Sequence, residues 1–292
     1  MAVNAKAVKE LREKTGAGML DCKKALDETN GDIDKAIDYL REKGIAKAQK
    51  KGSRVAAEGL ASVVVKDNDA ILFELNSETD FVAKNKEFLE LIDQVGQELM
   101  NGSAADLEAA LALPVEDGSM ADLIVKATSR IGEKLELRRY VRVTKTADQV
   151  FGAYTHMGGK IASLVTLEGA AEDVARDIAM HVAANNPNYL DESQVSDDVI
   201  AHERSVLRAE ALNEGKPEAI VDKMVEGRLN KMLKDICLVH QPFVKNPDET
   251  VAAHVKAAGG SIVSFVRLEV GEGIEKKSED FASEVQAQMK AA

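Results

Sequence analysis

LASVVVKDNDAILFELN, residues 60–76, has the pattern of a β-hairpin. Its two arms, 60–66 and 70–76, are rich in β-branched and apolar residues, and the tripeptide DND at 67–69 between them favours a turn. Beyond the hairpin the apolar residues recur at helical spacing, at Phe88, Leu91, Ile92, Val95 and Leu99. Further on, Ser119 and Asp122 match a capping box, which predicts another helix from there through Ile131. A hairpin followed by helices predicts an α+β fold, with one face of the strands covered by the helices.

The same order of elements recurs further along the chain. VFGAYTHMGGKIASLVTLEG, residues 150–169, predicts two strands around Gly158-Gly159, and a helix that ends at Asn186-Pro187 follows. SIVSFVRLEV, residues 261–270, predicts a further strand. The repeat favours a core of two similar α+β subdomains, the first over 55–145 and the second over 146–195 with 235–270.

Helices are predicted on both sides of this core. Residues 1–40 form three short helices, the third with Asp32 as its N-cap, in a small domain that resembles a ubiquitin-associated fold in form only. The basic stretch REKGIAKAQKKGSR, 41–54, completes this domain, either as a solvated linker helix or as a docking surface for an anion.

A helical hairpin is predicted as an insertion at 196–234, split by Gly215-Lys216-Pro217. We expect an antiparallel coiled coil with its seam on two sets of residues, Val199 with Val206 and Ile220 with Met224 and Gly227. A carboxy-terminal module, 271–292, is expected to contain a helix from Ser278 that presents Phe281 and Val285.

Composition limits the function. The 292 residues carry a net charge of −12, which disfavours a general nucleic-acid binder, and no apolar run reaches the roughly 20 residues of a membrane span. The amino terminus lacks the apolar core of a signal peptide, so a cytoplasmic location is expected. Cys22 and Cys237 are far apart and the five histidines show no ligand spacing, which predicts neither a disulfide nor a metal site. No phosphate-loop or nucleophile motif is present, so we expect that the protein holds no cofactor and is not an enzyme.

One segment stands out directly after the hairpin. In SETDFV, residues 77–82, Thr79 or Asp80 can cap a helix, which places Phe81 in its first turn. Phe81 either staples this helix to the hairpin or is an exposed anchor for a partner, with Asp80 as a charge beside it.

Two long strings identify a family. LREKTGAGMLDCKKAL, 11–26, and ELNSETDFVAK, 74–84, resemble the signature motifs of elongation factor Ts, the guanine-nucleotide exchange factor for the translational GTPase EF-Tu. The resemblance continues through HVAANNP, VEGRLNKML, QPFV and FVRLEVGEGIEK, in the arrangement of the longer bacterial form. The family layout matches the segments predicted above: a three-helix domain, two α+β subdomains, an inserted coiled coil and a carboxy-terminal helical module.

The resemblance also implies a partner and contact residues. EF-Tu, GDP-bound or nucleotide-free, is the implied partner, with no direct nucleic-acid or membrane contact. Thr79, Asp80, Phe81 and Val82 are implied to enter the GTPase near its Mg²⁺ and displace it. The other implied contacts are Arg12, Met19, Lys23, His156 and Phe281. The alternative is a protein-interaction module with a ubiquitin-associated-like domain that does not stimulate exchange.

Overall fold

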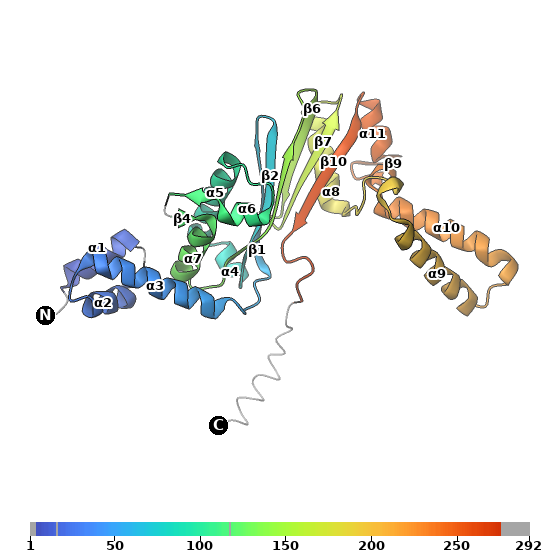
Figure 1. Ribbon diagram of the computed structural model, residues 1–292. Helices are drawn as coiled ribbons and strands as arrows, with labels where there is room; N and C mark the ends of the chain where they lie inside the picture. Colours follow the sequence, from blue (N-terminus) through green and yellow to red (C-terminus); the bar gives the residue numbers. More distant parts are fainter. Residues whose placement is uncertain (1–3, 16, 117, 276–292) are drawn as a thin grey trace.

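Two three-stranded antiparallel sheets form the centre of the protein in the computed structural model, which describes residues 4–275 except 16 and 117 (Figure 1). The first sheet has the order β1 (Glu58–Lys66), β2 (Asp69–Ser77) and β5 (Glu136–Thr144). The second has the order β10 (Ser261–Glu269), β7 (Ile161–Glu168) and β6 (Gln149–His156). Each sheet combines a hairpin with a third strand that follows intervening helices and pairs with the hairpin's second strand. The mixed α+β class is as the sequence predicted.

Both predicted hairpins form. In the first, Lys66 pairs with Asp69, so the turn contains two residues rather than the predicted three, and Asp67 takes the left-handed conformation with φ 54°. In the second, His156 pairs with Ile161 around the predicted glycines.

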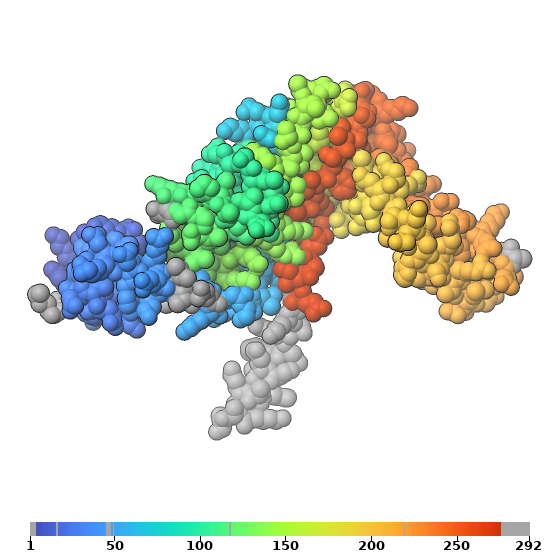
Figure 2. Space-filling view, viewed as in Figure 1, coloured from blue at the N-terminus to red at the C-terminus, as the bar shows by residue number. Residues whose placement is uncertain are grey.

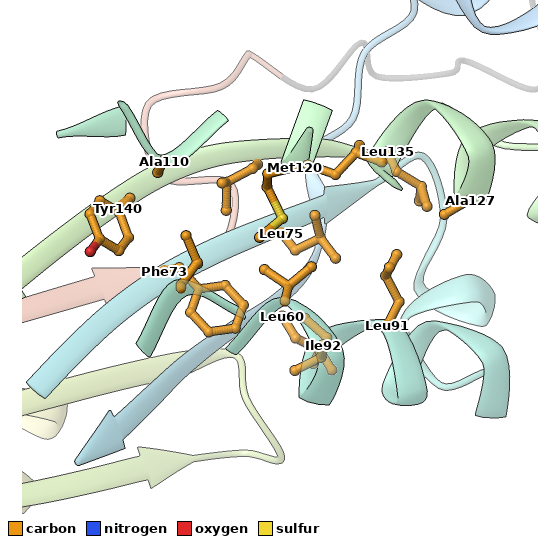
Figure 3. Close-up of a cluster of buried hydrophobic side chains, with 14 of the residues drawn as sticks. Leu60, Phe73, Leu75, Leu91, Ile92, Ala110, Met120, Ala127, Leu135 and Tyr140 are labelled. Carbon is orange, nitrogen blue, oxygen red and sulfur yellow. The ribbon is translucent and has the colours of Figure 1, made fainter. Parts of the chain in front are cut away.

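Helices pack on one face of the first sheet. They are α4 (Asp80–Ala83), α5 (Lys86–Asn101), α6 (Leu107–Ala112) and α7 (Met120–Ile131), with the short strands β3 (Pro114–Val115) and β4 (Gly118–Ser119). All five apolar residues predicted on α5 are buried, and Figure 3 shows Leu91 and Ile92 of this helix near Phe73 and Leu75 of the sheet. The predicted capping box is confirmed, since Ser119 and Asp122 exchange side-chain and backbone hydrogen bonds of 2.9 and 3.2 Å.

The second sheet is covered by α8 (Glu172–Asn185) and by α11 (Val251–Ala257), which follows β8 (Pro242–Phe243) and β9 (Asn246–Thr250). Gly152 of β6 lets α8 approach closely, because a Cβ there would lie 2.0 Å from the backbone carbon of Ala175. A separate apolar cluster that includes Ala61, Leu72 and Leu164 joins the two sheets.

A buried carboxylate also connects the sheets. Glu74 of β2 is fully buried, and both of its oxygens accept hydrogen bonds from Arg138 at 3.1 and 3.3 Å. Arg139 donates to the same carboxylate and also reaches Glu272, 2.9 Å away. The Gly271 amide donates to Glu74 at 2.8 Å. This set of bonds fixes the loop that leaves β10 against the first sheet.

Three helices precede the first sheet, as predicted: α1 (Ala5–Thr15), α2 (Met19–Glu28) and α3 (Ile33–Lys51). The Asp32 carboxylate accepts a hydrogen bond of 3.1 Å from the Lys35 amide, so the predicted N-cap is confirmed. The basic stretch is not a separate linker helix, because α3 continues through it to Lys51. Gly44 of this stretch is buried and lies against Ser129 of α7, so this part of α3 packs on the first sheet's helices instead of being fully solvated.

The predicted helical hairpin forms as α9 (Asp197–Asn213) and α10 (Glu218–Ile236), and it projects from the sheets (Figures 1 and 2). Gly215, with φ 74°, allows the chain to reverse after α9. The helices are tied by ion pairs between Arg204 and Glu226 at 3.0 Å and between Arg228 and Glu214 at 2.9 Å.

The predicted seam of this hairpin is wrong, by one residue at four of its five positions. Val199, Val206, Ile220 and Gly227 are exposed and Met224 is only half-buried. The two helices contact each other instead through residues one position after the predicted ones, such as Ile200, Leu207, Val221 and Val225. A shift of one residue turns a helix face by about 100°. Two apolar stripes therefore run along the arm: the second lies between the two helices, and the first is mostly exposed.

Candidate protein interface

The segment after β2 forms a fixed turn that presents Phe81 to solvent. Thr79 is the N-cap of α4, and its hydroxyl accepts a hydrogen bond of 3.4 Å from the Val82 amide. Glu133, from the loop after α7, accepts a hydrogen bond of 2.7 Å from the Thr79 hydroxyl and one of 2.9 Å from its amide. The cap is therefore held from two directions, by its own helix and by a loop more than fifty residues away in sequence.

Within this turn the four predicted residues divide into two pairs. Thr79 is half-buried and Val82 is buried in the core of the first sheet, so these two anchor the turn. Asp80 is half-buried, and Phe81 is 81% exposed, so these are the side chains available to a partner. The staple interpretation of Phe81 is wrong, because a stapling side chain would be covered by the hairpin.

Asp80 remains charged. Its carboxylate accepts a hydrogen bond of 2.7 Å from the Lys84 ammonium, which lowers the pKa of Asp80, with a smaller contribution from the positive charge of Lys160. A half-exposed, ionised carboxylate next to an exposed phenylalanine gives the tip of the turn both an apolar and an anionic group.

The turn between β6 and β7 is a second protrusion. His156 is exposed, and its Nδ1 lies 3.2 Å from the Tyr154 hydroxyl. Met157 is 72% exposed and has a φ of 49°, a conformation that few residues other than glycine adopt. The predicted contact residues include His156 but not Met157.

These two protrusions lie at the same end of the first sheet. Glu58, the first residue of β1, pairs with Ser77, which directly precedes the Phe81 turn. At the same end of β1, the Gly159 carbonyl accepts a hydrogen bond of 2.7 Å from the Ala61 amide, and Lys160 forms an ion pair of 2.6 Å with Glu58. The structure thus brings Asp80 and Phe81 close to the turn that bears His156, which the sequence spacing alone could not establish.

The amino-terminal candidates are also accessible. Arg12 on α1 and Met19 and Lys23 on α2 are exposed, and Met19 and Lys23 are one helical turn apart. Leu20 is 84% exposed and was not predicted as a contact. The sequence did carry a signal for it, since Leu20 falls outside the buried face of α2 formed by Cys22, Ala25 and Leu26. Phe281 lies outside the described residues.

Both cysteines of the chain are buried. Burial raises the pKa of the thiols of Cys22 and Cys237, which opposes their use as nucleophiles. Among these residues no group of three or more His, Cys, Asp or Glu side chains could hold a metal ion. The helices that the structure describes include none that is both long and apolar enough to cross a bilayer.

Rigid turns that expose large apolar side chains are features of a protein that binds another macromolecule. A family model described as Elongation factor TS matches residues 78–272, most of the chain, and the protein belongs to this family. Membership places it among the translation elongation factors. The matched region begins at Glu78, so it includes the Phe81 turn and His156 and excludes α1 and α2. The contact roles of all these residues stay predictions.

Proposed function

We propose that this protein is the guanine-nucleotide exchange factor of EF-Tu, and that it acts in the cytoplasm by binding without covalent chemistry. The observation that carries the proposal is the 81% exposed Phe81 on a turn held by Thr79 and Glu133. A rigid anchor loses little conformational entropy when it enters a partner, so most of its burial energy is available for distorting that partner.

The mechanism requires differential binding. A nucleotide held by a phosphate loop and Mg²⁺ leaves slowly unless another molecule binds the empty conformation better than the loaded one. Phe81 as a wedge, with the charged Asp80 beside it near the metal, supplies this difference, while Thr79 and Val82 hold the wedge in position. His156, Arg12, Met19 and Lys23 supply affinity from separate parts of the surface, and Phe281 is a further proposed contact from the carboxy-terminal module.

The proposed layout has five parts: a three-helix domain at 1–54, subdomains at 55–145 and at 146–195 with 235–270, the arm at 196–234 and a module at 271–292. The identical connectivity of the two sheets supports the pair of subdomains. In this layout the arm is an insertion into the second subdomain.

Reciprocal coupling tests the proposal. If this protein lowers the affinity of EF-Tu for GDP by a given factor, GDP must lower the affinity of EF-Tu for this protein by the same factor. We expect calorimetric titration of EF-Tu to give a markedly larger Kd in saturating GDP with Mg²⁺ than with the nucleotide-free GTPase. Equal Kd values in the two conditions would favour the alternative, a protein-interaction module that does not stimulate exchange.

His156→Ala should weaken the complex by about 1–2 kcal/mol, the loss typical of a truncated interface side chain. The exposed ring makes one hydrogen bond, to Tyr154, so the melting temperature should hardly change. Calorimetric titration against EF-Tu measures the effect. Tyr154→Phe is the matched control, because it removes the same hydrogen bond and keeps the imidazole. If the His156→Ala variant binds EF-Tu as tightly as the wild-type protein, His156 is a turn residue and not an interface contact.

The arm should be dispensable for exchange. Its outer part, 204–226, can be replaced by a short Gly/Ser linker while Ile200, Leu229 and Leu233 stay to cover the base. We expect the shortened protein to retain most of its stimulation of GDP release, with a circular-dichroism spectrum that shows only the lost helix. Near-complete loss of stimulation from a folded variant would show that the arm belongs to the GTPase interface.

A further inference from the structure

A cleft of about 510 Å³ lies between the amino-terminal helices and α7. Its walls come from the end of α1, the start of α2, the middle of α3, the β3–β4 turn and one face of α7. In Figure 1 these helices lie next to one another, and Gly44 of α3 touches Ser129 of α7 at the contact between them. The volume is within the range of about 300–1,000 Å³ that is usual for small-molecule sites.

Cations predominate around this cleft, although the protein as a whole carries a charge of −12. Among the residues that the structure describes, six basic side chains line it: Lys14, Lys24, Arg41, Lys43, Lys126 and Arg130. Three acidic side chains oppose them: Asp21, Glu116 and Asp122. Positive charge concentrated in a concave site raises the local concentration of anions.

One of the three acids, Asp122, already accepts hydrogen bonds at the start of its own helix, α7. The Asp122 carboxylate accepts hydrogen bonds from the Ser119 amide at 2.9 Å and from the Ser119 hydroxyl at 2.8 Å, and these lower the pKa of Asp122. Lys14 pairs with Glu10 at 3.1 Å and Arg130 pairs with Glu87 at 3.6 Å, and both pairs are solvent-exposed and therefore weak. Lys126 and Asp21 also have partners. Basic side chains thus outnumber acidic ones by two to one among the described residues that line the cleft.

The cleft also has an apolar lining. Ile37, Tyr39 and Leu40 of α3 and Val125 of α7 line it and are only half-buried. The Lys43 ammonium lies 5.4 Å from the centroid of the Tyr39 ring, so an aromatic surface and a cation are next to each other. A ligand that satisfies both features has an apolar or aromatic body and at least one anionic group.

We propose that this cleft binds a small organic anion with an aromatic or apolar body. The ligand would contact α2 and α3 on one side and α7 on the other, and would join the amino-terminal helices to the first sheet's helices. None of the exposed residues assigned to the EF-Tu contact lines the cleft: Gly18, which precedes α2, and Asp21 and Lys24 of α2 line it, whereas Met19 and Lys23 do not. The cleft residues therefore differ from the proposed EF-Tu contacts.

Fluorescence titration of the full chain with 1-anilinonaphthalene-8-sulfonate, an aromatic sulfonate, tests the proposal. We expect one saturable site, with a Kd that rises with added salt. N-phenyl-1-naphthylamine has nearly the same aromatic body without the sulfonate, and it should bind at least about tenfold more weakly, because it loses the attraction of the cations.

Paired variants locate the site. Lys24→Glu with Lys43→Glu should raise the Kd of the sulfonate by about tenfold or more, since it makes acids outnumber bases around the cleft. Both lysines are exposed, so the fold and the melting temperature should be unchanged. Lys223→Glu with Lys231→Glu on α10 makes the same change in net charge away from the cleft and should leave the Kd unaltered. Equal effects of the two pairs, equal binding of the two probes, or absence of saturable sulfonate binding would each overturn the proposal.

Discussion

Replacing Phe81 with alanine should reduce stimulated GDP release by about thirtyfold or more, the loss expected when an anchor worth at least 2 kcal/mol is removed from an interface. The isolated protein should keep its stability within about 0.5 kcal/mol, because the side chain is 81% exposed and packs on little of its own fold. Stopped-flow release of fluorescent GDP from EF-Tu and thermal melting of the free variant measure the two quantities separately.

The matched control is Val65→Ala. Val65 is another exposed apolar residue, 43% accessible, but it pairs with Ala70 at the opposite end of β1 from the Phe81 turn. It should leave both exchange and melting unchanged. A large drop in the melting temperature of Phe81→Ala would contradict the wedge assignment, and so would an exchange rate equal to that of Val65→Ala.

Asp80 should act in the same step as Phe81. Because both residues are proposed to displace one element of the GTPase, the loss in the double alanine variant should be smaller than the sum of the two single losses. Strict additivity would indicate two independent contacts.

Glu74→Ala should cost about 3 kcal/mol of folding stability, near the lower end of the range for breaking a buried ion pair. The substitution leaves Arg138 and Arg139 without their buried carboxylate and removes the acceptor of the Gly271 amide. The lower end applies because the side chains of both arginines keep about a quarter of their surface in solvent, and both also bond to Glu272.

Urea unfolding followed by circular dichroism measures this loss. Glu90→Ala is the control, because Glu90 forms an exposed pair with Lys86 at 3.4 Å and should change stability by less than about 1 kcal/mol. If the two variants unfold at the same urea concentration, the Glu74 network does not hold the sheets together.

The parts of the fold that local sequence determines were predicted well. The β-branched runs gave the hairpins, the spacing from Phe88 to Leu99 gave the buried face of α5, and Ser119 with Asp122 gave the start of α7. Each of these depends on residues within a few positions of one another, so periodicity and capping are sufficient to find them.

The errors arise where two local patterns are equally good or where contacts are distant. In the arm, Val199 and Val206 are seven residues apart, but so are Ile200 and Leu207, and spacing cannot decide which pair faces the other helix. The Glu74 network joins residues that are up to 197 positions apart, and no pairing of one acid among 50 can be foreseen from the sequence.

At the candidate interface too, features set by local sequence were predicted and features set by distant contacts were not. The sequence indicated a capped turn and left the exposure of Phe81 open, because exposure depends on which surface the hairpin leaves uncovered. Glu133, which fixes the turn through Thr79, lies 54 residues away and was not foreseen. Met157 was missed because a positive φ at a residue other than glycine has no sequence pattern of its own.

The proposed exchange activity is measured by the release rate of fluorescent GDP from EF-Tu in Mg²⁺ with increasing amounts of this protein. We expect the rate to rise and saturate with the wild-type protein. We expect Phe81→Ala, at concentrations that saturate the GTPase, to lose most of this rise. A release rate that stays at the intrinsic value while the wild-type protein demonstrably binds EF-Tu would contradict the proposed exchange activity.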